Sequence, residues 1–330
     1  MVLKTLKSMP SKIYPLINLR SKNDLAKRIS SKKLTTKKAL ILINDVLKNF
    51  DNYWHDSKKA SEPLKEKYVR SAVGNNLGEL LDLINKKILA PHDGLLPPFI
   101  FGGISKKDHV QAAVNLLGKK GRVFYKLDLT HFFEQVTKES VFNFFLKSGC
   151  SRKISALLSK LCCVPEGPKN TKGSKLVLAR GFSTSPRLSV WCNLITFKML
   201  NWRVGRVLKK YDFKISIYVD DIGISASKVD LELMNQALSL SKKIIETGNL
   251  KINEGKTVFP VMFSKTVEYL GLRLGRKKVS LGRATQAKLD RTIKARQKSG
   301  CSKKIKERLK GLKNYKKHVN SVKKLETIKT

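Results

Sequence analysis

Two adjacent carboxylates, Asp220 and Asp221, lie within the apolar segment KISIYVDDIGIS at residues 214–225. The β-branched and aromatic residues on either side of the pair predict strands, and strand interiors normally exclude Asp. Two anions at the tip of a hairpin repel each other, and a divalent cation such as Mg²⁺, which prefers carboxylate oxygens, relieves that repulsion. An Asp-Asp pair alone is common in turns, but between strands of this quality it indicates a metal site.

A third carboxylate, Asp128, ends the predicted strand RVFYKLDL at Arg122–Leu129. Taken alone, it would be interpreted as a turn former at the end of a strand. Adjacent antiparallel strands, however, would place Asp128 beside Asp220. Carboxylates from separate strands can hold two metal ions roughly 3.5–4 Å apart, which is the arrangement that phosphoryl transfer to a growing chain requires. The combination therefore favours a metal-binding role for Asp128.

The chain is strongly basic, with a formal net charge of +43 from 68 Lys and Arg residues against 25 Asp and Glu residues. An excess of this size indicates a polyanionic partner, because counterion release from phosphates drives binding without sequence recognition. The alternative is a Lys-rich surface that only keeps the protein soluble, although solubility does not require charges of a single sign. With 41% hydrophobic residues among 330, the chain can bury a sizeable core, and we expect one unit with subdomains.

Several classes of protein are disfavoured by what the sequence lacks. Met1–Pro10 has no apolar stretch of the kind found in secretory signals, and no apolar run is long enough to span a bilayer, so we expect a cytoplasmic protein without a membrane partner. The five cysteines form no CxxC pair, which disfavours a zinc site or a disulfide framework and fits a reducing cytoplasm. The five histidines show no HExxH or comparable spacing, so nothing indicates a metal bound through His or Cys.

Hydrophobic periodicity predicts an α+β fold in which helices alternate with the strands that contain the carboxylates. Helices are expected over Thr36–Phe50, Leu77–Leu89, Asp108–Leu117, Lys138–Lys147, Arg152–Cys163, Pro186–Lys210 and Asp230–Thr247, the last ended by Gly248. Besides the acidic strands, strands are expected over Lys175–Leu178, Leu250–Ile252, Val258–Pro260 and Val267–Leu274. This order of elements fits a mixed sheet with helices packed on one face.

Both ends of the chain are rich in lysine. Residues 1–34 mix apolar with basic residues and are interpreted as an extension that orders on RNA. From Arg283 to Thr330, seventeen Lys or Arg residues stand against three acidic ones. The spacing of Leu289, Ile293 and Leu309 predicts two or three short helices that grip nucleic acid. For about the last fifteen residues, a solvated basic tail is an equal alternative.

Several segments resemble the motifs of reverse transcriptases, in the order in which that family has them: FGGISKK, KLDLTHFF, RGFSTSP, YVDD, LKINEGKT and EYLGL. The resemblance covers roughly residues 90–275, most of the chain. It implies a right-hand polymerase fold, with fingers, a palm made of an antiparallel sheet with helices on one face, and a small helical basic thumb. The implied domains are an N-terminal helical extension with the start of the fingers at 1–90, fingers and palm at 91–282, and thumb with C-terminal tail at 283–330.

The resemblance also implies roles for individual residues. Asp128, Asp220 and Asp221 would be catalytic and hold two Mg²⁺ ions, with Mn²⁺ as a substitute and Asp221 as the more peripheral ligand. Phe133 falls where the family places an aromatic steric gate that leaves no room for a 2′-hydroxyl, although an ordinary core position is the alternative for one of the rings Phe132 and Phe133. The implied nucleotide-binding residues are Phe133, Lys106, Lys107, Arg180, Gly181 and Lys256, and the implied primer and template contacts are Tyr218, Ser185, Pro186, Leu270 and Gly271.

The chain departs from the family pattern at several positions. Arg180 replaces the glutamine of the motif that RGFSTSP resembles and adds a charge near the template–nucleotide pocket, and the fingers motif lacks its usual arginine. In a chain this basic, Lys256 could also be an ordinary surface lysine. Retron enzymes have NAxxH before the first catalytic Asp and VTG beyond the primer-grip region, where this chain reads KDHVQAAVNLL and VSLG. We therefore favour a defence-associated or unclassified retron-like enzyme over a typical retron enzyme.

The function that the resemblance implies is RNA-directed DNA synthesis: a structured non-coding RNA is copied into DNA from dNTPs in bacterial anti-phage defence, together with a protein effector. The alternatives are a typical retron reverse transcriptase that makes multicopy single-stranded DNA, and a non-catalytic RNA-binding protein on a palm scaffold. A nucleotidyl cyclase is disfavoured, because it would need a GGDEF-like hairpin and less positive charge. The template RNA, the priming mode and the oligomeric state stay open.

Overall fold

The structure, a computed structural model, describes residues 13–118, 121–171, 173–263, 267–275, 278–298 and 302–325. The chain forms two compact units, each built from segments that are distant in sequence. The first unit comprises Met1–Pro97 with His131–Phe197, and the second comprises Pro98–Thr130 with Lys198–Thr330. The three-part division at residues 90 and 282 stays a prediction. No helix in the described ranges is long and apolar enough to cross a membrane.

The first unit is mainly helical. Its helices are α1 (Lys22–Ile29), α2 (Thr36–Asn49), α3 (Asn76–Ile84), α5 (Lys138–Lys147), α6 (Arg152–Cys162) and α7 (Ser185–Cys192). Two small antiparallel pairs join β1 (His55–Asp56) to β2 (Arg70–Ser71) and β4 (Cys163–Pro165) to β5 (Leu176–Leu178). All of these helices except α7 begin at a polar side chain that accepts a backbone N–H, as Thr35 does for α2 and Asn75 for α3.

The described part of the predicted N-terminal extension belongs to the core of the first unit. Ile17 and Leu19 are buried, and the backbone N–H of Ile17 donates to the carbonyl of Ser148 at 2.8 Å. Ser21 and Asp24 form the capping box that begins α1. The prediction of an extension that orders on RNA is wrong for residues 13–34, because several of their apolar side chains, Ile17 and Leu19 among them, are buried in the protein itself. Residues 1–12 lie outside the described part of the chain.

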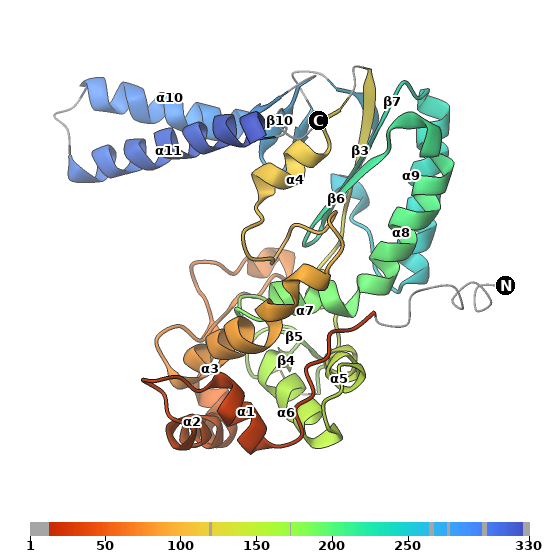
Figure 1. Cartoon of the computed structure of the whole chain (residues 1–330). Coiled ribbons are helices and arrows are strands. Elements are labelled where there is room, and N and C mark those ends of the chain that lie inside the picture. The colour runs from red at the N-terminus through yellow and green to blue at the C-terminus, as the bar shows by residue number, and fades with distance from the viewer. Residues whose placement is uncertain are drawn as a thin grey trace. The chain divides into compact units, whose positions relative to one another are not determined.

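The second unit is built on a four-stranded antiparallel sheet in the order β6-β7-β3-β8, of which Figure 1 labels β3, β6 and β7. Its strands are β3 (Arg122–Asp128), β6 (Lys214–Tyr218), β7 (Asp221–Ser227) and β8 (Val258–Met262). The central strands β3 and β7 are buried along nearly their whole length, so other elements must shield both faces of the sheet from solvent. The antiparallel sheet that the resemblance implies is therefore present, and the mixed sheet inferred from element order is wrong.

Helices lie on both faces of this sheet. On one face the Tyr125 hydroxyl of β3 lies 2.7 Å from the Ser241 hydroxyl of α9 (Leu231–Thr247). On the other face the Ser216 hydroxyl of β6 donates to the carbonyl of Ala112 in α4 (His109–Asn115) at 2.8 Å. The prediction of helices on one face alone is wrong, because successive residues of the central strands are apolar in both directions and α4 covers the second face.

A three-stranded antiparallel sheet, in the order β11-β10-β9, precedes the basic C-terminal helices. Its strands are β9 (Glu268–Tyr269), β10 (Leu272–Leu274) and β11 (Val279–Leu281). The helices are α10 (Arg283–Lys298) and α11 (Lys303–Leu325), which lie side by side in Figure 1. Val319 and Val322 of α11 are buried, so a solvated tail is wrong for the described part of the C-terminus. Residues 326–330 lie outside that part.

Other predicted elements differ from the structure in detail. The helix predicted at Pro186–Lys210 is divided into α7 and α8 (Leu194–Val207) at Asn193, whose side chain donates to the carbonyl of Ser189 at 2.9 Å. The segment Leu250–Ile252 contributes only an isolated bridge to Leu129 instead of a strand. The strand predicted at Val267–Leu274 is the β9–β10 hairpin, because its central residues turn the chain at positive φ.

Candidate active site

The register of the central sheet places two of the three predicted carboxylates directly opposite each other. Asp128 at the end of β3 and Asp221 at the start of β7 are Cα partners. Within the β6–β7 hairpin, Tyr218 is the partner of Asp221, so Val219 and Asp220 form a two-residue turn. The expectation that Asp128 lies beside Asp220 is therefore shifted by one residue, because the turn closes before Asp221 and not after it.

The turn that contains Asp220 is strained. Val219 has a φ of 58°, in a region where a β-branched residue is rare and costs of the order of 1–3 kcal/mol. Gly102 supports this turn from outside, since a Cβ built on Gly102 would lie 2.3 Å from the backbone nitrogen of Val219. The neighbouring backbone follows β6, with the N–H of Phe101 donating to the carbonyl of Ile217 at 2.8 Å. The FGG part of FGGISKK thus holds the acidic turn in place.

This contact predicts the effect of adding one methyl group. Gly102→Ala should lower the free energy of unfolding by about 1–3 kcal/mol, because the turn at Val219 must move to make room. Gly94→Ala is the matched control, since a Cβ there meets nothing within 4 Å. Urea unfolding of both variants checks the prediction. Equal stability of the two alanine variants would show that Gly102 does not support the turn.

Two lysines lie against the carboxylate pair. The Lys126 ammonium forms an ion pair with Oδ1 of Asp221 and lies 3.8 Å from Oδ1 of Asp128. Lys256, which belongs to the LKINEGKT segment, lies 3.4 Å from Oδ2 of Asp128. Burial raises the pKa of Asp221, and the positive charge of Lys126 acts in the opposite direction. Lys256, whose nucleotide-binding role stays a prediction, therefore lies against the carboxylate pair, and Lys126 is a further neighbour that the motifs did not indicate.

The chemistry of this pair fits a divalent cation. Two carboxylates that are largely buried and face each other need a counter-charge, and their oxygens are the donors that Mg²⁺ prefers. In the described part of the chain, no three His, Cys, Asp or Glu side chains converge as a ready-made metal site. Asp220 would therefore have to join Asp128 and Asp221 when a metal binds.

Tyr269 supports the acidic hairpin from within the core, and sequence reasoning did not single it out. Its hydroxyl donates to the carbonyls of Ser216 and Asp221 at 3.1 and 3.2 Å, and burial raises its pKa well above the usual range. A Cβ built on Gly223 would lie 3.0 Å from the Tyr269 ring, so the absence of a side chain at Gly223 gives the ring its place. The only signal in the sequence was the EYLGL motif, from which Leu270 and Gly271 were chosen instead.

Removing the Tyr269 hydroxyl should destabilise the β6–β7 hairpin without leaving a cavity in the core. Tyr269→Phe keeps the ring but leaves the two carbonyls without this donor, and a buried unsatisfied group costs about 1–3 kcal/mol of stability. Tyr211→Phe serves as a control, because Tyr211 lies in a surface turn and is only half-buried. Thermal unfolding of both variants measures the difference. An unchanged melting temperature for Tyr269→Phe would rule out this support.

In the first unit, the structure distinguishes the two adjacent phenylalanines. Phe132 is fully buried and its ring lies 6.2 Å from that of Phe197, whereas Phe133 is only partly buried. The guanidinium of Arg180 lies 5.2 Å from the centre of the Phe133 ring. Arg180 also forms a bidentate pair with Glu134, with both nitrogen–oxygen distances at 2.9 Å. Phe132 is the core ring, and Glu134, which the motif analysis missed, balances the charge that Arg180 adds.

The RGFSTSP segment is held by internal contacts. Gly181 has a φ of 102°, and a Cβ there would lie 2.3 Å from the carbonyl oxygen of Arg70 in β2. Ser185 is fully buried, and its hydroxyl donates to the carbonyl of Ala179 at 2.6 Å. Pro186 occupies the first turn of α7. The Ser185 hydroxyl is thus bonded within the segment, and the template contact of Ser185 and Pro186 stays a prediction.

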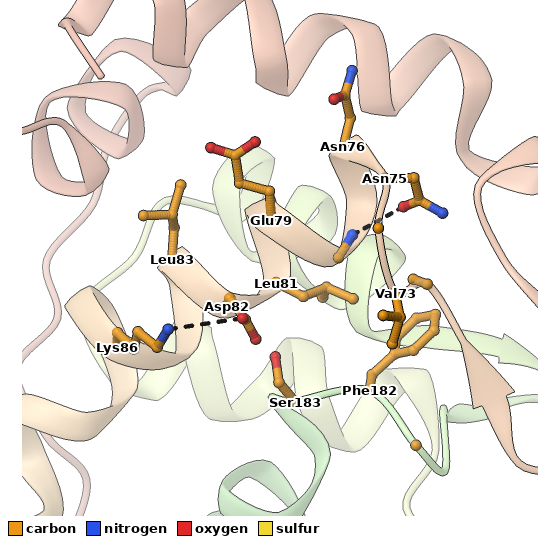
Figure 2. A pocket seen from close by; sticks show the side chains of 14 residues that line it. Val73, Asn75, Asn76, Glu79, Leu81, Asp82, Leu83, Lys86, Phe182 and Ser183 are labelled. Atoms are coloured by element: carbon orange, nitrogen blue, oxygen red, sulfur yellow. Dashed lines mark hydrogen bonds and ion pairs between the residues drawn. The ribbon is translucent and has the colours of Figure 1, made fainter. Parts of the chain in front are cut away.

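A pocket of about 590 Å³ opens beside the same segment, between Gly181–Ser183 and the start of α3. Figure 2 shows Phe182 and Ser183 on one side of the pocket and Leu81 and Asp82 on the other. The charged residues of its lining are Glu79, Asp82 and Lys86, and the Lys86 ammonium lies 3.8 Å from Oδ2 of Asp82. None of the predicted nucleotide-binding residues except Gly181 lines it.

The remaining predicted nucleotide, primer and template residues lie in loops and hairpins of the second unit. Lys107 donates to the carbonyls of Pro98 and Ile100 at 3.2 and 2.8 Å, whereas Lys106 is exposed with a φ of 63°. Leu270 and Gly271 form the two-residue turn of the β9–β10 hairpin, with φ of 52° and 72°. Tyr218 is partly buried, and its ring lies 6.3 Å from that of His109. Of the two lysines, Lys106 has the more accessible ammonium.

Comparison with known proteins identifies the region that contains these residues. Residues 72–274 match the family described as reverse transcriptase (RNA-dependent DNA polymerase). The chain is 31% identical over 157 residues to the retron Ec86 reverse transcriptase of Escherichia coli, covering 48% of this chain and 44% of that protein. It is 26% identical over 151 residues to the retron Mx65 reverse transcriptase of Myxococcus xanthus, covering 41% of this chain and 32% of that protein. The matched segments thus span less than half the length of these relatives.

Proposed function

Because the chain belongs to the reverse transcriptase family, we propose that it is an RNA-directed DNA polymerase that copies an RNA template from dNTPs. The observation that supports this most is the pairing of Asp128 with Asp221 across adjacent antiparallel strands. Such a pair, with Asp220 beside it in the turn, provides the carboxylates of a two-metal nucleotidyl transfer site. A non-catalytic RNA-binding protein has no need for this arrangement, which disfavours that alternative.

The proposed metal ligands are Asp128, Asp220 and Asp221, which would hold two Mg²⁺ ions or Mn²⁺ in their place. When bound, the ions would activate the attacking hydroxyl and neutralise charge on the leaving pyrophosphate. Lys256 lies against Asp128 with its side chain 65% exposed, so its ammonium can also reach an incoming triphosphate. Lys106 is proposed as a second cation for the triphosphate, while Lys107 holds the carbonyls of its own loop.

Selection of the sugar is proposed to rest on Phe133. The ring is fixed from one side by the Arg180 guanidinium, which Glu134 orients through two hydrogen bonds. A fixed ring can exclude a 2′-hydroxyl by contact, whereas a mobile one would yield. The substitution of Arg180 for the family glutamine thus fits a supporting role for this residue, in which its charge is neutralised within the protein and not by the nucleotide.

The template is proposed to be a structured non-coding RNA, and the biological role to be anti-phage defence with a protein effector. The retron reverse transcriptases among its relatives and the net charge of +43 support an RNA partner. A typical retron enzyme that makes multicopy single-stranded DNA is the alternative, and the absence of NAxxH and VTG disfavours it.

Sequencing the nucleic acid that co-purifies with the protein from its native cell tests the choice of template. We expect one RNA species to be strongly enriched, together with DNA complementary to part of it. The Asp220→Ala, Asp221→Ala double variant is the control and should retain the RNA but lose the DNA. Recovery of bulk cellular RNA in proportion to its abundance would contradict a cognate template.

A further inference from the structure

Lys126 occupies an unusual position for a lysine. It lies on β3 two residues before Asp128, so its side chain is on the same face of the sheet as that carboxylate. Its partner on β7 is Gly223, and Asp221 is the next residue of β7 on that face. The Lys126 side chain is only 17% exposed. Lysine is almost never buried to this extent unless it is paired.

The partners of Lys126 are the proposed metal ligands themselves. Its ammonium pairs with Oδ1 of Asp221 and lies 3.8 Å from Oδ1 of Asp128. Lys256 contacts the other oxygen of Asp128, but its side chain is 65% exposed, so water and salt screen its charge. Lys126 is therefore the nearer and better shielded of the two positive charges that stabilise the carboxylate pair.

We propose that Lys126 is a positioning residue that acts as an internal counter-ion: it holds Asp128 and Asp221 together without metal and competes with the divalent cation for the same oxygens. This inference rests on the proposed metal site. The Lys126 ammonium contacts Oδ1 of Asp221, and a metal ion bound to the same oxygen would have to take the place of that ammonium. The ammonium and the cation therefore exclude each other at Asp221, and the binding of one weakens the binding of the other.

Two consequences follow from this competition. Without metal, loss of the Lys126 charge leaves two buried carboxylates facing each other, so the protein should become less stable. With metal, the same loss removes the competitor, so the divalent cation should bind more tightly. A lysine that only strengthens the fold would give the first effect without the second. The sign of the change in metal affinity therefore identifies the role.

The test uses the full-length protein freed of metal with a chelator, and Mn²⁺ as the probe, followed by electron paramagnetic resonance. Lys126→Met keeps the length of the side chain and removes its charge. We expect Lys126→Met to bind Mn²⁺ about 5- to 150-fold more tightly than wild type, the usual range for the coupling of two ligands. Its melting temperature in the chelator should be lower than that of wild type.

Further variants make the result specific. Lys126→Arg keeps the charge and should retain the metal-free stability, and Lys126→Gln is a second neutral variant should the methionine variant fail to fold. Lys256→Met should change Mn²⁺ affinity less, because that side chain is mostly exposed. In the Asp221→Asn background, Lys126→Met should have little further effect, because the shared oxygen has lost its charge.

Unchanged or weaker Mn²⁺ binding by the neutral Lys126 variants would overturn the proposal. If neither wild type nor these variants bound Mn²⁺ at a site that Asp128→Asn removes, the proposed metal site would itself be wrong. These outcomes separate a failure of the counter-ion role from a failure of the proposed function.

Discussion

The Asp220→Ala, Asp221→Ala double variant should lose DNA synthesis by about 10³-fold or more, which corresponds to roughly 4 kcal/mol of lost transition-state stabilisation. The reason is that the metal ions would keep only Asp128 as a ligand from this sheet. Asp128→Asn should have a comparable effect, because it removes the carboxylate of β3 that pairs with Asp221 of β7. Extension of a labelled primer on an RNA template measures the loss.

RNA binding by the double variant should stay largely intact, because the positive charge that attracts the phosphates is spread over the whole chain. Asp51→Asn is a matched control, since Asp51 is an exposed carboxylate of the first unit and should not affect synthesis. Filter binding alongside primer extension separates the two properties. Continued synthesis by the double variant would contradict the assignment of the metal ligands.

Phe133→Ala should admit ribonucleotides. Removal of the ring opens the space in which a 2′-hydroxyl would otherwise collide, and a pocket difference of a few atoms changes selectivity by about 10- to 200-fold. Arg180 and Glu134 remain paired in this variant, so the surrounding charge is unchanged. Single-nucleotide incorporation of dNTP and rNTP, compared as kcat/KM, measures the ratio.

Phe132→Ala is the control for the sugar gate. That ring is fully buried, so its loss should cost about 3–5 kcal/mol of stability by leaving a cavity. Its effect on the choice between dNTP and rNTP should be small. If sugar discrimination were unchanged in Phe133→Ala, Phe133 would not be the gate, whatever happens in the Phe132 variant.

Local sequence patterns were sufficient for most of the elements around the site. The strand that ends at Asp128 and the acidic hairpin are where apolar residues predicted them, and α9 covers the helix predicted over Asp230–Thr247, with Asp230 as its N-cap. The register of the hairpin was the exception. A turn that begins at Val219 requires a positive φ at a β-branched residue, which sequence rules disfavour, and support from Gly102 is a long-range contact that no local pattern shows.

The residues that sequence reasoning missed act through contacts between distant segments. Tyr269 was hidden within a short apolar motif, and its bonds to Ser216 and Asp221 depend on how the two sheets of the second unit pack. Glu134 follows the two phenylalanines, but only folding brings it to Arg180. Lys126 lies two residues before Asp128 on β3, so the alternation of a strand could have predicted that both share one face. It could not have predicted the ion pair with Asp221.

The end segments show a different limit. Residues 13–34 have a composition typical of a basic extension, yet several apolar side chains among them, such as Ile17 and Leu19, are buried in the first unit. The C-terminal helix α11 likewise buries Val319 within a Lys-rich sequence. High charge predicts a solvated surface on average, and a sparse apolar stripe is enough to fix such a segment to the core.

The most direct test of the proposed function is primer extension by the purified wild-type chain on a primed RNA template, with dNTPs and Mg²⁺. We predict complementary DNA whose sequence follows the template, whose formation stops when the metal is chelated and resumes when Mg²⁺ or Mn²⁺ is restored. Failure to extend a primer on RNA with either metal, including the RNA that co-purifies with the protein, would contradict the proposed function.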